Sequence, residues 1–303
     1  MGDELFGLPW QQRTPFLASN GEYETARAVI LGAPMDWSVS YRPGSRFGPA
    51  SIREVSEAIE EYSPYRDKSL FDLAFYDAGD LVLPFGNTAG ALDLIETAVR
   101  GLLAAGKFPL LLGGEHLVSY PAIRAAHRHY PDLCVFQFDA HTDLRPGYLG
   151  QQLSHASVMR LAQNLLGDGR VFQFGIRSGD REEFAFARDH THLYRGGVLD
   201  AVQAAIREIG SRPVYVTVDI DVVDPAHAPG TGTPECGGIT SAELLRVFDY
   251  LPSLQVVGFD LVEVLPAVDL SARTALLAAV LVREALLGLV CVQGDRTIQE
   301  EFK

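Results

Sequence analysis

Three potential metal ligands, Asp139, His141 and Asp143, lie within five residues of one another. They follow Cys134 to Phe138, a mostly apolar and aromatic run that predicts a β-strand. Side chains at alternate positions of an extended segment point to one side, so we expect these three to converge. Two carboxylates and an imidazole suit a divalent ion. The motif therefore predicts a metal site at the carboxyl end of a strand.

Ligand-type residues also end two other predicted strands. His116 follows the apolar run 108–112, and Asp219 and Asp221 follow the run 214–218. A lone histidine is more often structural, and a lone aspartate at a strand end usually forms a turn. Two carboxylates on a buried strand are harder to explain as structural residues, because burying both charges without a partner is costly.

The combined set holds four carboxylates and two imidazoles: His116, Asp139, His141, Asp143, Asp219 and Asp221. One ion rarely needs so many protein ligands, whereas two ions with bridging carboxylates do. Oxygen-rich ligands without thiolates favour manganese, with cobalt and nickel as alternatives. Two ions lower the pKa of a water held between them and so provide a nucleophile. The residues alone thus predict a binuclear metallohydrolase.

Strand and helix patterns alternate along the chain with short links. The predicted strands are 28–31, 73–76, 108–112, 134–138, 171–176, 193–194, 214–218 and 255–259. The predicted helices are 49–62, 89–105, 120–130, 154–166, 197–209, 241–250 and 272–289, and residues 1–25 read as irregular. This order predicts one α/β domain over residues 1–303, with a mostly parallel sheet of about eight strands. Ligands of such sheets bind beyond the carboxyl ends of the strands, where every motif above is expected to lie.

The composition excludes several classes of protein. A formal net charge of −14 argues against a nucleic-acid or anionic-membrane surface. The most apolar helix, 272–289, is interrupted by charged residues and is too short to span a membrane. Cys134, Cys236 and Cys291 are odd in number and far apart, and residues 1–10 lack the features of a secretory signal. We therefore expect a protein of the reducing cytoplasm.

Three segments resemble the metal motifs of the ureohydrolase family, which includes arginases and agmatinases: Gly113-Gly114-Glu115-His116, Asp139-Ala140-His141-Thr142-Asp143 and Asp219-Ile220-Asp221-Val222-Val223-Asp224-Pro225. The segments 44–49, 230–238 and 260–264 also resemble the family. The resemblance implies a three-layer αβα fold with an arginase-like sheet. It also implies two Mn²⁺ per chain and a homo-oligomer, a trimer or a hexamer.

The resemblance further implies a role for each site residue. His116, Asp139, Asp143 and Asp219 would hold one ion, and His141, Asp139, Asp219 and Asp221 would hold the other. Glu263 would receive the guanidinium of the substrate, although by itself it reads as a solvated loop charge. Asp143 would pass a proton to the departing amine. His155 lies near the family's proton-shuttle histidine, but its sequence surroundings differ, and the alternative is a polar residue at a helix start.

The far end of the substrate is less well specified. The segment 144–153 lacks the Asn-Thr and Ser-Gly-Asn pattern of arginases, which favours agmatine, cleaved to putrescine and urea, over arginine. Arg145 in the pocket would repel the ammonium of agmatine and suit a guanidino acid such as guanidinobutyrate. We favour the alternative that Arg145 points to solvent or to an adjacent subunit. Two other possibilities are a single-zinc amide deacetylase of the same fold and a non-catalytic binding protein, and both would be expected to keep fewer of the ligands.

Overall fold

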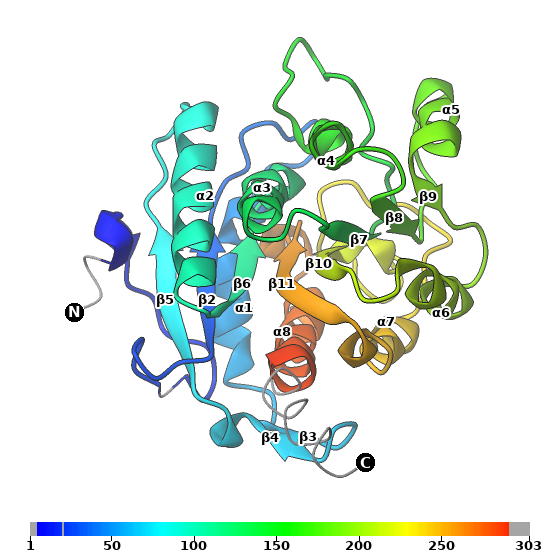
Figure 1. Ribbon diagram of the computed structural model, residues 1–303. Coiled ribbons are helices and arrows are strands. Elements are labelled where there is room, and N and C mark those ends of the chain that lie inside the picture. Colours follow the sequence, from blue (N-terminus) through cyan, green and yellow to red (C-terminus); the bar gives the residue numbers. More distant parts are fainter. Residues whose placement is uncertain (1–4, 20, 291–303) are drawn as a thin grey trace.

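The computed structural model describes residues 5–19 and 21–290, and its centre is a nine-stranded sheet (Figure 1). The strand order is β1-β5-β2-β6-β11-β10-β7-β8-β9. Strands β2 to β11 of this sheet pair in parallel, and only β1 pairs antiparallel, with β5. The expected mostly parallel sheet is confirmed. The strands are β1 (Trp10–Gln11), β2 (Ala28–Ala33), β5 (Phe75–Leu81), β6 (Phe108–Gly113), β7 (Cys134–Phe138), β8 (Val171–Phe174), β9 (His192–Leu193), β10 (Pro213–Asp219) and β11 (Gln255–Val262).

Helices cover both faces of the sheet. The helices are α1 (Gly48–Ser56), α2 (Thr88–Ala104), α3 (Ser119–His129), α4 (Val158–Leu166), α5 (Arg181–His190), α6 (Val198–Ile209), α7 (Ser241–Val247) and α8 (Arg273–Ala285). One apolar cluster joins α1, α6, α7 and α8 to one face, and a second joins α2, α3 and α4 to the other. Alternate residues of the central strands enter opposite clusters, as the pleat of a strand requires. The result is the expected three-layer αβα arrangement.

Several elements differ from the sequence-based expectation. Helix α1 ends at Ser56 instead of residue 62, and the following chain forms a small antiparallel ribbon of β3 (Tyr62–Ser63) and β4 (Lys68–Ser69). Strand β1 lies in a segment expected to be irregular. Helix α5 was not predicted at all, although Asp180 and Glu183 form a capping box at its start. The last predicted helix ends in a π-helical turn, Leu286–Val290.

Two further expectations concern cysteines and membranes. Cys134 is buried, Cys236 is exposed, and both are free thiols, whereas Cys291 lies outside the described residues. Within residues 5–19 and 21–290, no helix is both long and apolar enough to cross a membrane.

Candidate active site

The predicted ligand residues gather at the carboxyl ends of three central strands. His116 follows β6, the segment Asp139–Asp143 follows β7, and Asp219 is the last residue of β10. Because β11 lies between β6 and β10, its end brings Glu263 to the same edge of the sheet. Segments that are distant in sequence thus meet at one place.

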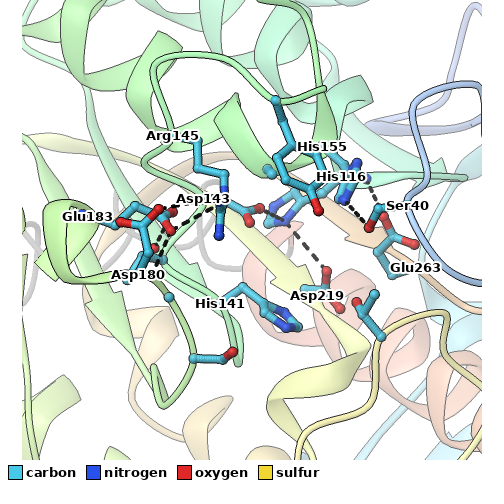
Figure 2. Close-up of a pocket in the computed structure, with 16 residues that line it drawn as sticks. Ser40, His116, His141, Asp143, Arg145, His155, Asp180, Glu183, Asp219 and Glu263 are labelled. Atoms are coloured by element: carbon cyan, nitrogen blue, oxygen red, sulfur yellow. Dashed lines mark hydrogen bonds and ion pairs between the residues drawn. The ribbon is translucent and has the colours of Figure 1, made fainter. Parts of the chain in front are cut away.

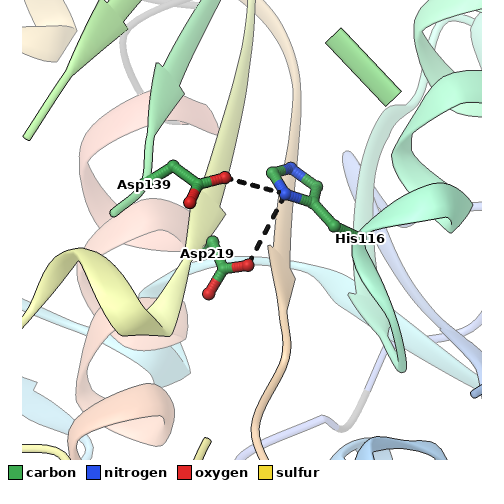
Figure 3. A group of neighbouring side chains, drawn as sticks. All are labelled: His116, Asp139 and Asp219. Atoms are coloured by element: carbon green, nitrogen blue, oxygen red, sulfur yellow. Dashed lines mark ion pairs between the residues drawn. The ribbon is translucent and has the colours of Figure 1, made fainter. Parts of the chain in front are cut away.

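One group of possible metal ligands consists of His116, Asp139 and Asp219 (Figure 3), and Asp143 lies beside it. The Nδ1 atom of His116 lies 3.0 Å from Asp139 Oδ2, 3.0 Å from Asp143 Oδ2 and 3.5 Å from Asp219 Oδ2. The imidazole is buried, and Nδ1 makes no hydrogen bond of acceptable geometry despite these neighbours. A buried nitrogen without a partner, facing three carboxylates, fits a divalent cation.

A second group contains Asp139, His141 and Asp221, whose ligand atoms lie within 4.8 Å of one another. His141 Nδ1 is 3.0 Å from Asp221 Oδ2 and 3.6 Å from Asp139 Oδ1. Asp221 Oδ2 is buried and has no hydrogen-bond partner. Asp139 belongs to both groups, as a carboxylate that bridges two ions would. The donor atoms therefore fit two adjacent divalent cations.

The expected strand geometry of the Asp139–Asp143 motif is wrong in one respect. Strand β7 ends at Phe138, so the motif lies in a loop instead of extending the strand. Asp143 adopts a left-handed backbone with φ 51°, and Asp221 lies in the 3-10 turn Ile220–Val222. The side chains converge because the loop turns, not because alternate strand positions share a face. Asp219 remains on its strand, as expected.

Backbone amides hold the carboxylates in this loop. The N–H of His141 donates to Asp139 Oδ1 at 2.6 Å, and the N–H of Ala140 donates to Asp221 Oδ1 at 3.0 Å. The N–H of Asp221 donates to Asp219 Oδ1 at 2.9 Å. These bonds orient the carboxylates before any ion binds.

Crowding of the carboxylates perturbs their protonation. Burial and the neighbouring charge of Asp139 raise the pKa of Asp143 to about 7. Burial, with the charges of Asp221 and Asp139, raises the pKa of Asp219 well above its usual range. Burial alone would lower the pKa of His141, but Asp221 and Asp139 raise it to about 12. A divalent cation that binds these groups would therefore compete with protons, so its affinity should depend on pH.

A cavity of about 250 Å³ opens onto the ligand groups (Figure 2). Glu263 lines it, is 6% exposed and has a left-handed backbone with φ 63°. Its Oε1 accepts a hydrogen bond from the backbone N–H of His116 at 2.8 Å. The reading of Glu263 as a solvated loop charge is therefore wrong. Burial raises its pKa to about 8, although the bond from His116 acts in the opposite direction.

His155 also lines the cavity and begins a 3-10 turn before α4. Its backbone N–H donates to Ser38 Oγ at 2.9 Å, and its Nε2 lies 3.4 Å from Ser40 Oγ. Ser38 Oγ in turn donates to the buried Glu115 at 2.8 Å. Burial lowers the pKa of His155 to about 4, so the imidazole is neutral at pH 7. This value lies well below the near-neutral pKa that suits a proton shuttle, so only the position of His155 on the cavity wall favours that role.

Arg145 lines the cavity, contrary to the orientation that we favoured from the sequence. Its guanidinium lies 3.2 Å from Asp180 Oδ2 and 3.4 Å from Glu183 Oε2, and 4.8 Å from the centre of the Tyr148 ring. Both carboxylates also line the cavity. Sequence reasoning missed them, although the Asp-x-x-Glu capping box of α5 could have marked the position. Figure 2 shows this charged cluster on the side of the cavity opposite Glu263.

Known proteins resemble this chain over most of its length. Residues 26–288 match the family model described as "Arginase family". An agmatinase of Bacillus subtilis is 54% identical over 278 residues, which cover 91% of this chain and 96% of that protein. A guanidinobutyrase of Pseudomonas aeruginosa is 35% identical over 292 residues, which cover 92% of each chain. The crystal structure of the agmatine ureohydrolase of Thermoplasma volcanium matches with a TM-score of 0.84 and 34% identity, covering 92% of this chain and 95% of that one.

Proposed function

This chain belongs to the Arginase family, and on that premise we propose that it is an agmatinase, which hydrolyses agmatine to putrescine and urea with two Mn²⁺. The observation that carries the proposal is the pair of ligand groups sharing Asp139, beside the buried carboxylate of Glu263. We assign His116, Asp139, Asp143 and Asp219 to one ion. We assign to the other ion His141, Asp139, Asp219 and Asp221.

Two divalent cations bound there would supply an activated water as nucleophile and would neutralise developing negative charge. Oxygen donors predominate in the ligand set and thiolates are absent from it, which supports manganese. Retention of both ligand groups also argues against a single-zinc deacetylase and against a binding protein that has lost its ligands.

Glu263 orients the substrate. One of its carboxylate oxygens is occupied by the N–H of His116, which leaves Oε2 for the planar guanidinium cation. By holding the guanidinium carbon next to the ligand groups, Glu263 would make a bimolecular attack effectively unimolecular.

Two residues handle protons. Asp143 Oδ2 faces His116 Nδ1 within the ligand set, and Asp143 can pass a proton to the departing amine. The proton that Asp143 passes on would come from the attacking water. His155 presents Nε2 toward Ser40, another residue of the cavity wall, where it would exchange further protons with water that enters the cavity.

The charge balance opposite Glu263 supports agmatine over a guanidino acid. Arg145 brings one positive charge to the cavity wall, whereas Asp180 and Glu183 bring two carboxylates. The cluster therefore attracts an ammonium more strongly than a carboxylate. A guanidino acid stays the second candidate because Arg145 does line the cavity and because the guanidinobutyrase of Pseudomonas aeruginosa is a relative.

The test is a comparison of kcat/KM for agmatine, 4-guanidinobutyrate and arginine, with urea release as the assay. We expect agmatine to exceed both by at least about tenfold, since one unfavourable charge contact is worth roughly 1.4 kcal/mol or more. A preference for 4-guanidinobutyrate would overturn the substrate assignment but not the reaction. Absence of urea from all three in the Mn²⁺-loaded protein would overturn the reaction.

The resemblance to the family also supports a single-domain, homo-oligomeric protein, a trimer or a hexamer, acting in the cytoplasm. Light scattering of the purified protein tests the assembly, and a mass equal to one chain would refute it.

A further inference from the structure

A row of buried polar side chains crosses four adjacent strands directly beneath the ligand groups. It consists of Asp260 on β11, Thr217 on β10, Gln137 on β7 and Gln173 on β8, and we call it the polar row. Asp260 pairs with Thr217, Thr217 with Gln137, and Gln137 with Gln173 in the sheet register. All four are 0% exposed. Unpaired polar groups at this depth would be costly, so their hydrogen bonds indicate what the row does.

One half of the polar row holds His116. Thr217 Oγ1 donates to Asp260 Oδ1 at 2.5 Å, which uses its only proton. His116 Nε2 lies 3.0 Å from the same Oγ1, so Nε2 has to be the protonated nitrogen that donates to it. The neutral imidazole then carries its lone pair on Nδ1. That is the atom that faces Asp139, Asp143 and Asp219 without a hydrogen bond of its own.

The other half of the polar row holds Asp139. Gln173 Nε2 donates to Gln137 Oε1 at 2.6 Å, so the amide of Gln137 turns its nitrogen toward the site. Gln137 Nε2 donates to Asp139 Oδ2 at 2.7 Å and to the backbone oxygen of His141 at 3.1 Å. Gln173 Nε2 also donates to the backbone oxygen of Thr142 at 2.9 Å, and because that oxygen can only accept, this bond fixes the orientation of the Gln173 amide.

We propose that the polar row sets the donor atoms of the metal centre, with separate effects of its two halves. Asp260 and Thr217 fix the tautomer of His116, which belongs to one ligand group only. Gln173 and Gln137 orient Asp139, which belongs to both groups. These are positioning residues, since none of them is a member of a ligand group. The inference rests on the proposed ligands but not on the proposed substrate.

The first test compares Thr217→Val with Thr217→Ser by calorimetric titration of the metal-free protein with Mn²⁺. Valine matches the shape of threonine but removes the hydroxyl, so we expect one of the two binding events to weaken about 10- to 100-fold, as for lost partners of ligand histidines elsewhere. The other event should stay within about threefold. Serine keeps the hydroxyl, so both binding events should stay near the wild-type level in that variant. Equal weakening in the valine and serine variants, or wild-type binding in the valine variant, would overturn the proposal.

The second test uses Gln137→Leu, which releases Asp139 and should weaken both binding events. Loss of only one event would refute the separate roles of the two halves.

Circular dichroism and cooperative unfolding of the metal-free variants establish that each one folds. If the valine variant does not fold, Thr217→Ala replaces it, because it also removes the hydroxyl that accepts from His116 Nε2. Wild-type metal binding in that variant would count against the proposal. No measurement here involves a substrate, so failure of the agmatinase assignment would be seen separately.

Discussion

Replacing Glu263 by glutamine separates substrate orientation from metal binding. Glu263 is 6% exposed, and its Oε1 already accepts a hydrogen bond from the backbone N–H of His116 at 2.8 Å. Glutamine can keep that bond through its own oxygen, so the backbone of His116 loses little. Its amide nitrogen then occupies the position of Oε2 and presents N–H groups to a guanidinium that also carries only donors.

The magnitude follows from the loss of a buried ionic hydrogen bond. Removing one partner of a desolvated charge pair costs about 2–5 kcal/mol. At about 1.4 kcal/mol per tenfold change in rate, kcat/KM should fall roughly 30- to 5,000-fold. Metal content should stay at the wild-type level, because Glu263 is not a member of either ligand group.

The assay is urea release from agmatine, with metal content measured on the same preparation. Glu235→Gln is the matched control. Glu235 lies 3.9 Å from His141 Nε2, but its side chain is 43% exposed and accepts a hydrogen bond from Ser178. We expect less than a fivefold change there, since an exposed charge contact is worth about 0–1 kcal/mol. If Glu263→Gln kept kcat/KM within fivefold of wild type with its metal intact, the role of Glu263 would be refuted.

Three further outcomes follow from the same site. Protein stripped of metal by a chelator should release no urea from agmatine and should recover on addition of Mn²⁺, whereas activity that survives metal removal would contradict the mechanism. Arg145→Ala should raise the kcat/KM ratio of agmatine to 4-guanidinobutyrate by about tenfold, as expected for the loss of one partly screened charge contact worth about 1.4 kcal/mol; an unchanged or lower ratio would show that the charge of Arg145 does not act on the tail of the substrate. Ser38→Ala removes the acceptor of the His155 backbone and should lower kcat by up to about tenfold with little change in KM, and Ser38→Thr should restore it; an unchanged kcat would refute the role of this contact.

The sequence predicted the ligand residues better than their geometry. Residue type and spacing correctly predicted that His116, Asp139 and Asp219 lie close together, because the carboxyl ends of parallel strands meet at one edge of a sheet. The turn that aims Asp143 depends on a left-handed backbone, which no alternation pattern reveals. Aspartate tolerates a left-handed backbone better than most residues do, so the residue type at position 143 did not reveal that the chain turns there.

The surroundings of the ligands were harder to predict. Asp180 caps α5 and Glu183 lies in its first turn, and the face of this helix mixes aromatic and charged residues, so the apolar periodicity of the helix is weak. Gln137 and Thr217 each stand alone among apolar neighbours, which makes their strands look uniformly buried. Only the sheet register shows that such isolated polar residues lie side by side.

The left-handed backbones of Asp143 and Glu263 imply that activity and stability are opposed at these two positions. Each residue adopts a positive φ, 51° and 63°, and each adds a carboxylate to a crowded, buried set. Glycine accepts such a backbone without strain and removes the charge. Asp143→Gly and Glu263→Gly should therefore raise the melting temperature of the metal-free protein while abolishing urea release. Selection of variants for heat resistance alone would favour such inactive proteins, so any effort to stabilise this enzyme has to screen for turnover as well.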